Sequence, residues 1–237
     1  SLPQDRADLY ERAVDLLLAH WENRIVRDVD GEQKVLPGLV MQLGIRTLTL
    51  RAALEQVAFD AHERQEQEAD RGERAADIPR EDLRDALEAD LGSVDRADAV
   101  IGYVQERAGL LQARDNRTYA FPHRTFQEYL AATYLLRQGE FDTMLRDRVR
   151  RDQSWWQEAF LLAAGASRDT PRNISDLVDC LLPMGPEGDT CSPEKAREAR
   201  LAAQALPPFQ PAVRSAAPLR PRAAALPRAV AAHRPAS

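Results

Sequence analysis

The chain has 237 residues, of which 44% are hydrophobic and 30% are charged. This composition is typical of a globular protein of one or two domains, which is large enough to form a core without disulfides. The sequence contains neither an apolar run of about 18 residues, the length that a membrane-spanning helix needs, nor an N-terminal signal pattern. We therefore expect a cytoplasmic protein.

Charge divides the chain into two unlike parts. Residues 1–198 contain all 38 acidic residues and 26 of the 32 basic ones, a net charge of −12. Residues 199–237 contain six arginines and no acid, a net charge of +6, and are rich in proline. We expect this tail to be disordered, because it cannot bury enough apolar surface to offset chain entropy. It would be an unselected linker, an out-of-frame extension of a GC-rich gene, or a basic arm for acidic partners.

Several catalytic classes are excluded by missing motifs. Only Lys34 and Lys195 are lysines and neither follows a glycine, so no GxxxxGK[ST] loop is present to bind nucleotide phosphates. GxGxxG and GxSxG are also missing. Cys180 and Cys191 are the only cysteines, and the histidines are scattered, so no CxxC or HExxH pattern can bind zinc. We expect neither a metal site nor catalysis from this chain alone.

Hydrophobic periodicity predicts two long helices in the N-terminal part. One covers residues 2–24 and ends near Asn23, and the other covers residues 37–64. An Asp-Gly turn signal separates them. The charged run that follows, residues 63–74, is typical of a solvated helix end or a loop.

The next segment has the element order of a winged helix. Residues 78–91 and 93–109 each predict a short helix, and glycine ends both. Residues 110–121 predict a β-hairpin, because residues 118–121 alternate in the manner of a strand and Asp115 and Asn116 suit the tip of the turn. Three helices followed by a hairpin favour a winged-helix domain.

The most specific stretch is FPHRTFQEYLAATYLL, residues 121–136. Thr125 and Glu128 have the spacing of a capping box, which predicts that a helix begins there. Its apolar stripe is expected to comprise Phe126, Leu130 and Tyr134.

Two further amphipathic stretches, residues 155–163 and 174–182, predict helices that pair in an antiparallel manner. Trp155 and Trp156 are expected to be packing residues of the first. Two units are too few to establish a repeat array.

The stretch 121–136 resembles the end of the winged-helix domain in NACHT proteins, which are STAND-type signalling NTPases. Residues 2–24 resemble the last helix of the helical domain that follows a NACHT nucleotide-binding core. The two resemblances occur in the family's order. The family pattern F-x-H-x-[ST]-F-Q-E-[YF]-x-A-A is matched by Phe121, His123, Thr125, Phe126, Gln127, Glu128, Tyr129, Ala131 and Ala132.

This resemblance implies a mainly α protein in which helical segments flank a winged-helix domain with one β-hairpin. Its parts would be the end of the helical domain (residues 1–46), the winged-helix domain (47–138), a helical segment that begins a second helical domain or a repeat array (139–198), and the disordered tail (199–237). The nucleotide-binding core is missing, so we interpret the chain as a fragment, a split-gene product or a degenerate copy.

The resemblance also implies a role for His123. In the family, the histidine of the F-x-H motif faces the β-phosphate of bound ADP and holds the winged helix against the core, and exchange for ATP releases it. The N-terminus of the following helix suits a phosphate as well, because its N–H groups and dipole point there. The side chain of Arg124 would either assist in binding the phosphate or be solvated. The NACHT core must come from the same gene or a separate chain, and this chain alone is expected to bind no cofactor.

We therefore expect the non-catalytic regulatory part of a NACHT signalling NTPase, which would sense ADP or ATP and gate homo-oligomerisation in bacterial defence or signalling. The alternative is a winged-helix regulator that binds DNA. Its candidate recognition helix, residues 95–108, has a net charge of −1, whereas binding in a DNA groove needs positive charge. For that reason we expect no nucleic acid partner and no membrane partner. A free-standing enzyme is a third alternative, which the missing motifs oppose.

Overall fold

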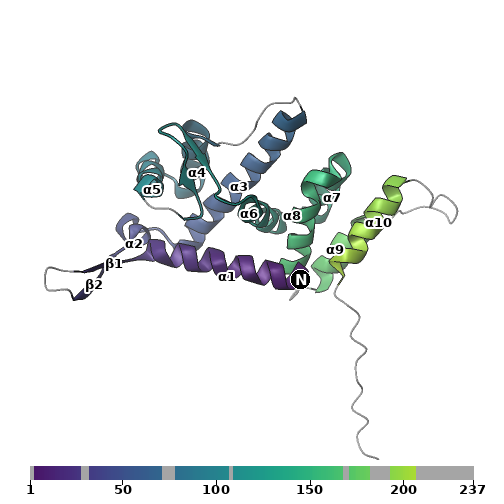
Figure 1. Ribbon diagram of the computed structural model, residues 1–237, viewed down its shortest axis with the longest axis horizontal. Coiled ribbons are helices and arrows are strands. Elements are labelled where there is room, and N and C mark those ends of the chain that lie inside the picture. Colours follow the sequence, from purple (N-terminus) through teal and green to yellow (C-terminus); the bar gives the residue numbers. More distant parts are fainter. Residues whose placement is uncertain are drawn as a thin grey trace, which may run out of the picture. The chain divides into compact units, whose positions relative to one another are not determined.

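Helices dominate the structure (Figure 1). The computed structural model describes residues 3–27, 32–70, 78–106, 109–167, 171–181 and 193–206. Within these ranges the helices are α1 (Pro3–Glu22), α2 (Leu39–Leu43), α3 (Thr47–Asp70), α4 (Arg80–Leu91), α5 (Val94–Glu106), α6 (Arg124–Leu136), α7 (Phe141–Arg151), α8 (Gln153–Ala166), α9 (Pro171–Leu181) and α10 (Pro193–Ala205). Two small antiparallel sheets lie between them. The prediction of a mainly α protein is confirmed.

The predicted winged helix is formed by α3, α4, α5 and a three-stranded sheet. Strands β4 (Gln112–Ala113) and β5 (Thr118–Ala120) pair as the expected hairpin. At its tip, the Asp115 carboxylate accepts hydrogen bonds from the backbone N–H groups of Arg117 at 2.7 Å and Thr118 at 2.8 Å. This local turn explains why the chain reverses at the predicted position.

The third strand of this sheet, β3 (Ile78–Pro79), was expected to be the start of a helix, and that expectation is wrong. Ile78 is buried and pairs with Tyr119 of β5, which places β5 between β3 and β4. Pro79 has no N–H to donate, and it occupies the N-cap position of α4. Gly92 ends α4 in the left-handed conformation, with φ of 69°, as the sequence predicts.

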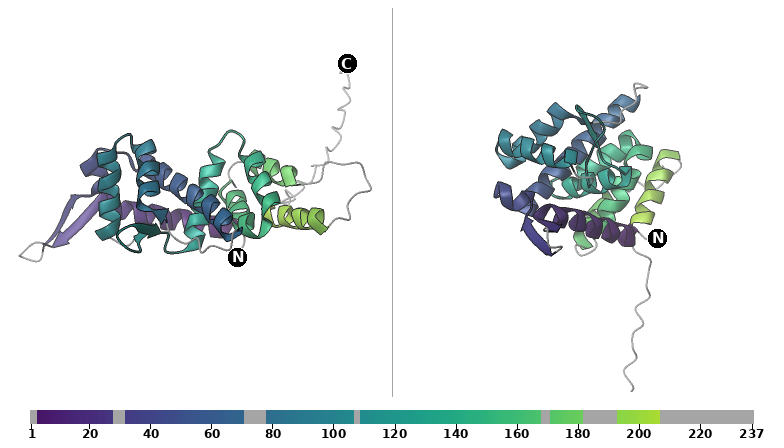
Figure 2. Two further views of the ribbon diagram at one scale, coloured as in Figure 1. Left: turned by 90° about the horizontal axis from the view of Figure 1, so that it is seen from above. Right: turned by 60° about the vertical axis from the view of Figure 1, so that its left-hand side comes forward.

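A second hairpin follows α1 and was not predicted. Strand β1 (Asn23–Arg27) pairs along its length with β2 (Gln33–Pro37). The hairpin projects away from the helices in both figures (Figures 1 and 2). Its Asp-Gly turn signal lies outside the described residues. The sequence does not predict these strands, because each has only five residues and polar and apolar residues do not alternate clearly along them.

The predicted helix over residues 37–64 is two helices. Gly44, with φ of 59°, closes the short α2 in the left-handed conformation, and α3 begins at Thr47. The charged run after residue 63 forms the last turns of α3, which continues to Asp70 and exposes Gln67, while residues 71–74 lie outside the described residues. Glu66 is buried in this run and forms an ion pair with Arg151 of α7. The helix continues because arginines from a distant segment neutralise its acids.

The start of α6 also differs from the prediction. His123 is the N-cap residue, so Thr125 is the second residue of the helix and the expected capping box is not formed. The Glu128 carboxylate instead accepts a hydrogen bond of 2.9 Å from Nε of Arg124, one turn earlier. This contact between oppositely charged side chains at i and i+4 stabilises the first turns of the helix, but no side chain caps the N-terminus.

The C-terminal helices extend further than the sequence predicts. Helix α7 was not predicted, because only a few apolar residues such as Leu145 and Val149 separate its charges. Helices α8 and α9 are confirmed, but α9 packs mainly against α7 and α10. The tail was expected to begin at residue 199, yet α10 continues to Ala205 and buries Leu201 against the core. Residues 207–237 lie outside the described residues.

One continuous hydrophobic core connects the described helices. The most extensive packing is that of α3 against α6, and α8 packs against both α6 and α1. Between these layers Phe59 stacks on Tyr134, with ring centroids 4.8 Å apart. Residues 1–207 form one compact unit, and the divisions at residues 46 and 138 stay predictions. None of the described helices is sufficiently long and apolar to cross a membrane.

His62 of α3 lies fully buried in this core. Its ring lies edge-on to Trp156, with centroids 4.6 Å apart, and 5.3 Å from the ring of Trp155. Neither ring nitrogen has a hydrogen-bond partner among the described residues. Burial, assisted by the charge of Arg124, lowers the pKa of His62 from 6.5 to about 3. The folded protein therefore holds this imidazole neutral.

We predict that His62 makes the fold sensitive to acid. The unfolded chain binds a proton at this residue below pH 6.5 and the folded chain does not, so the free energy of unfolding falls by up to about 1.4 kcal/mol per pH unit between 6.5 and about 3. A His62→Phe variant lacks this contribution. The free energy of unfolding of the variant minus that of the wild type should therefore increase as the pH is lowered from 7 to 4.

Urea unfolding followed by tryptophan fluorescence at several pH values measures this difference. Burial raises the pKa of Glu55 and of Glu128, which act in the opposite direction, but they are present in both proteins and cancel. Parallel pH dependences of the two proteins would show that His62 is not responsible.

Candidate functional site

His123 lies at the N-terminus of α6, between the hairpin strand β5 and the helix. Its backbone is extended, with φ of −131° and ψ of 130°, and its carbonyl oxygen accepts a hydrogen bond of 3.0 Å from the N–H of Phe126. The imidazole makes no capping hydrogen bond to the helix, and the residue is exposed. The neighbouring Phe121 is buried. The backbone is thus fixed while the imidazole faces solvent.

The start of α6 has the electrostatic character of an anion site. The first-turn N–H groups of a helix have no carbonyl partner within it, and the helix dipole adds a partial positive charge. The first turn of α6 contains no acidic residue, as is also true of α2, α3, α8 and α9, whereas the first turns of α4, α5, α7 and α10 contain one or two. No acid of its own first turn therefore neutralises this end of α6.

Arg124 follows His123 but is held against α8. Its side chain is 52% exposed, and its guanidinium carbon lies 4.0 Å from the ring centroid of Trp155. It also donates the hydrogen bond to Glu128 described above, and Glu128 is buried. The sequence left open whether Arg124 is solvated or assists a phosphate. In the structure the side chain is half exposed and is held by an acid and an aromatic ring, while a role toward a phosphate stays a prediction.

Trp155 connects this region to the winged helix. Its indole Nε1 donates a hydrogen bond of 3.1 Å to the backbone carbonyl of His62 on α3, while Arg124 of α6 lies over its ring. The residue was predicted to be a packing residue, which is confirmed by its contacts. Its link to the start of α6 could not be predicted, because it depends on side chains that are 31 positions apart in sequence.

A second cluster, which the sequence did not reveal, ties α1 to the winged helix. Arg51 of α3 donates hydrogen bonds to Asp15 of α1 at 2.7 Å, to Glu55 of its own helix at 3.0 Å and to the Tyr129 hydroxyl of α6 at 3.5 Å. Glu55 is only 1% exposed, and Arg137, the C-cap residue of α6, lies 3.1 Å from its other oxygen. Burial raises the pKa of Glu55, and the two arginines oppose that effect. The cluster joins α1, α3 and α6.

The described residues contain no group of three side chains that could bind a metal. Cys180 is a free thiol of α9, partly buried, and burial raises its pKa to about 12. A thiol with that pKa stays protonated at neutral pH and is a poor nucleophile. The chemistry that the start of α6 can provide is therefore the binding of a negatively charged group.

We predict that the cluster around Glu55 stabilises the fold. Arg51→Met leaves the buried Glu55 with Arg137 alone and removes the bonds to α1 and α6. The free energy of unfolding should decrease by about 2 kcal/mol, as expected when a largely buried ion pair loses one partner. Arg84→Met on α4, whose ion pair with Asp85 is exposed, is the matched control and should change it by less than about 0.5 kcal/mol. Urea titration measures both, and equal losses would contradict the prediction.

The helices and strands from α1 to α6 match a known protein family. The family model described as the winged helix-turn-helix domain C-terminal to NACHT matches residues 6–135, more than half of the chain. The matched range extends from α1 into α6 and includes His123. No curated protein and no solved structure shows a significant match. The chain therefore belongs to the family of winged helix-turn-helix domains that lie C-terminal to NACHT.

Proposed function

We propose that this chain is the control part of a NACHT signalling NTPase and that its winged helix senses whether the nucleotide-binding core holds ADP or ATP. The observation that carries the proposal is the exposed imidazole of His123 at an N-terminus with no acid in its first turn. It lies inside the range that matches the family. The core itself would be supplied by the same gene or by a separate chain.

In the proposed resting state, the imidazole N–H of His123 donates a hydrogen bond to the β-phosphate of ADP. The first-turn N–H groups and the dipole of α6 add to the attraction. A hydrogen bond to a charged group contributes about 1.5–3 kcal/mol, which changes the ratio of two states about ten- to a hundredfold. Exchange for ATP would remove this contact and release the winged helix from the core.

The remaining parts of the proposal follow from that switch. Released subunits would associate into a homo-oligomer, in the cytoplasm and in bacterial defence or signalling. ATP hydrolysis would belong to the core, since this chain is a winged-helix domain rather than a catalytic one.

No specific observation favours the alternative of a DNA-binding winged helix. The candidate recognition helix α5 carries Asp95, Asp98 and Glu106 against Arg96. Asp98 also lies 3.5 Å from Arg80 of α4, so that it neutralises a nearby cation. Neither feature provides the positive surface that phosphate contacts require.

His123 can be tested in a complex of the full chain with a NACHT core. We predict that His123→Ala weakens ADP affinity about tenfold, the effect of losing one hydrogen bond to a charged group. His123→Gln, whose amide can donate, should retain part of the affinity. Arg117→Ala on the exposed hairpin is the control and should not alter it. Isothermal titration with ADP measures all four proteins, and an unchanged affinity in His123→Ala would refute the phosphate contact.

We also predict that the isolated chain hydrolyses no ATP above background. The expectation rests on the missing phosphate-binding loop, since only Lys34 and Lys195 are lysines. Phosphate release from ATP and magnesium, measured with and without the chain, should be equal. Turnover that rises in proportion to the amount of chain and persists after repurification would contradict the assignment.

A further inference from the structure

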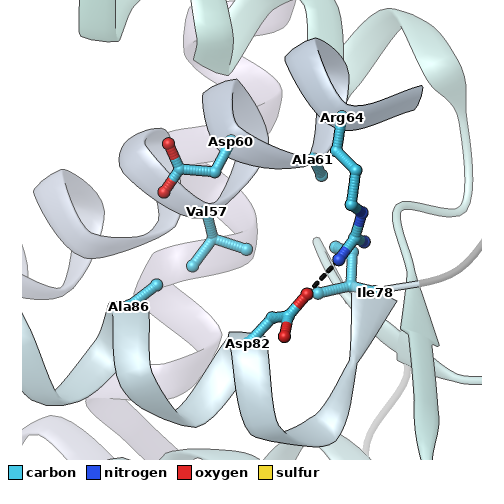
Figure 3. A pocket seen from close by; sticks show the side chains of 7 residues that line it. All are labelled: Val57, Asp60, Ala61, Arg64, Ile78, Asp82 and Ala86. Atoms are coloured by element: carbon cyan, nitrogen blue, oxygen red, sulfur yellow. Dashed lines mark hydrogen bonds and ion pairs between the residues drawn. The ribbon is translucent and has the colours of Figure 1, made fainter. Parts of the chain in front are cut away.

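A cavity of about 220 Å³ lies between α3 and α4 of the winged helix (Figure 3). It is smaller than the roughly 300–1,000 Å³ of pockets that take small-molecule ligands, so it suits a single side chain. No residue of the candidate phosphate site lines it. Its apolar lining comes from Val57, Ala61, Ile78 and Ala86.

Charged groups surround this apolar lining. Asp60 and Arg64 lie on the same face of α3 as Val57 and Ala61, because these positions are three or four residues apart. Asp82 of α4 forms an ion pair with Arg64 across the cavity (Figure 3). The rim thus contains two carboxylates and one guanidinium.

Asp60 is the carboxylate that is open to a further cation. It is exposed, whereas Asp82 already pairs with Arg64. Partial burial of the carboxylate raises the pKa of Asp60, and the negative charges of Glu63 and Asp90 raise it further, while a hydrogen bond with the Gln56 side chain and the charge of Arg64 only partly oppose them. An additional positive charge beside Asp60 would relieve this repulsion.

An apolar lining with a carboxylate at its rim fits a long side chain that has an aliphatic stem and a cationic end. Arginine suits it better than lysine, because the guanidinium is more weakly hydrated and pairs with carboxylates through two parallel hydrogen bonds. The Arg64–Asp82 pair is an example of that chemistry at the same rim. The net charge of −12 over residues 1–198 also favours a basic partner.

We propose that this cavity binds an arginine side chain presented by a partner protein. The stem of that side chain packs on Ala61 and Ala86, and its guanidinium pairs with Asp60, while Arg64 keeps its pairing with Asp82. The proposal does not depend on nucleotide sensing, since it uses none of the residues around His123.

The full chain, labelled with ¹⁵N, can be titrated with Nα-acetyl-arginine amide and followed by the chemical shifts of backbone amides. We expect saturable shifts at Val57, Ala61 and Ala86. The citrulline analogue has nearly the same shape but no charge, and it should bind at least tenfold more weakly. Equal binding of the two compounds, or the absence of saturable shifts with the arginine compound, would overturn the proposal.

Variants can distinguish binding in the cavity from long-range attraction by the negative charge of the chain. Asp60→Asn should weaken binding of the arginine compound about tenfold, and Asp85→Asn, which removes one exposed acid of α4 outside the lining, should change it less than twofold. Ala86→Leu fills the cavity and should abolish binding with an unchanged circular dichroism spectrum. Equal weakening by Asp60→Asn and Asp85→Asn would mean that only long-range charge attracts the compound, which contradicts a specific site.

Discussion

Two buried carboxylates of α3 constrain the positions of the surrounding helices. Glu55 and Glu66 are each 1% exposed, and a buried carboxylate without a cation destabilises a fold by several kcal/mol. Arg51 and Arg137 neutralise the first, and Arg151 neutralises the second. Because these arginines belong to α3, α6 and α7, the requirement for charge balance fixes how the later helices pack on the winged helix.

This constraint also determines the place of His123. Arg137 follows the last residue of α6 and binds Glu55, which holds the C-terminal end of the helix against α3. Arg124 holds its N-terminal end through Glu128 and Trp155. The helix is therefore attached at both ends, while the imidazole of its N-cap residue, His123, is exposed. The proposed phosphate contact would gain from this arrangement, because little backbone freedom would be lost when the ligand binds.

Local sequence patterns predicted the elements whose determinants lie within a few residues. The hairpin follows from alternation and the turn at Asp115, and the end of α4 follows from Gly92. The extension of α3 could not be predicted in this way, because the arginines that pair with Glu63 and Glu66 lie 85 residues away. Strand β3 was missed for the same reason, since its partner strand comes after two intervening helices. His123 was found through the family resemblance, whereas the contact of the neighbouring Arg124 with Trp155 of α8 required the three-dimensional structure.

The packing also bears on which body would move in the proposed switch. Arg51 of α3 and the exposed Asp15 of α1 form an ion pair, and such a pair contributes at most about 1 kcal/mol. The packing of α1 against α8 is extensive, however, and α8 packs in turn against α6 in the same core. A winged helix that rotated alone would have to expose this shared apolar surface. In the proposed release from the nucleotide core, this shared packing therefore favours a movement of α1, the winged helix and α8 as one body.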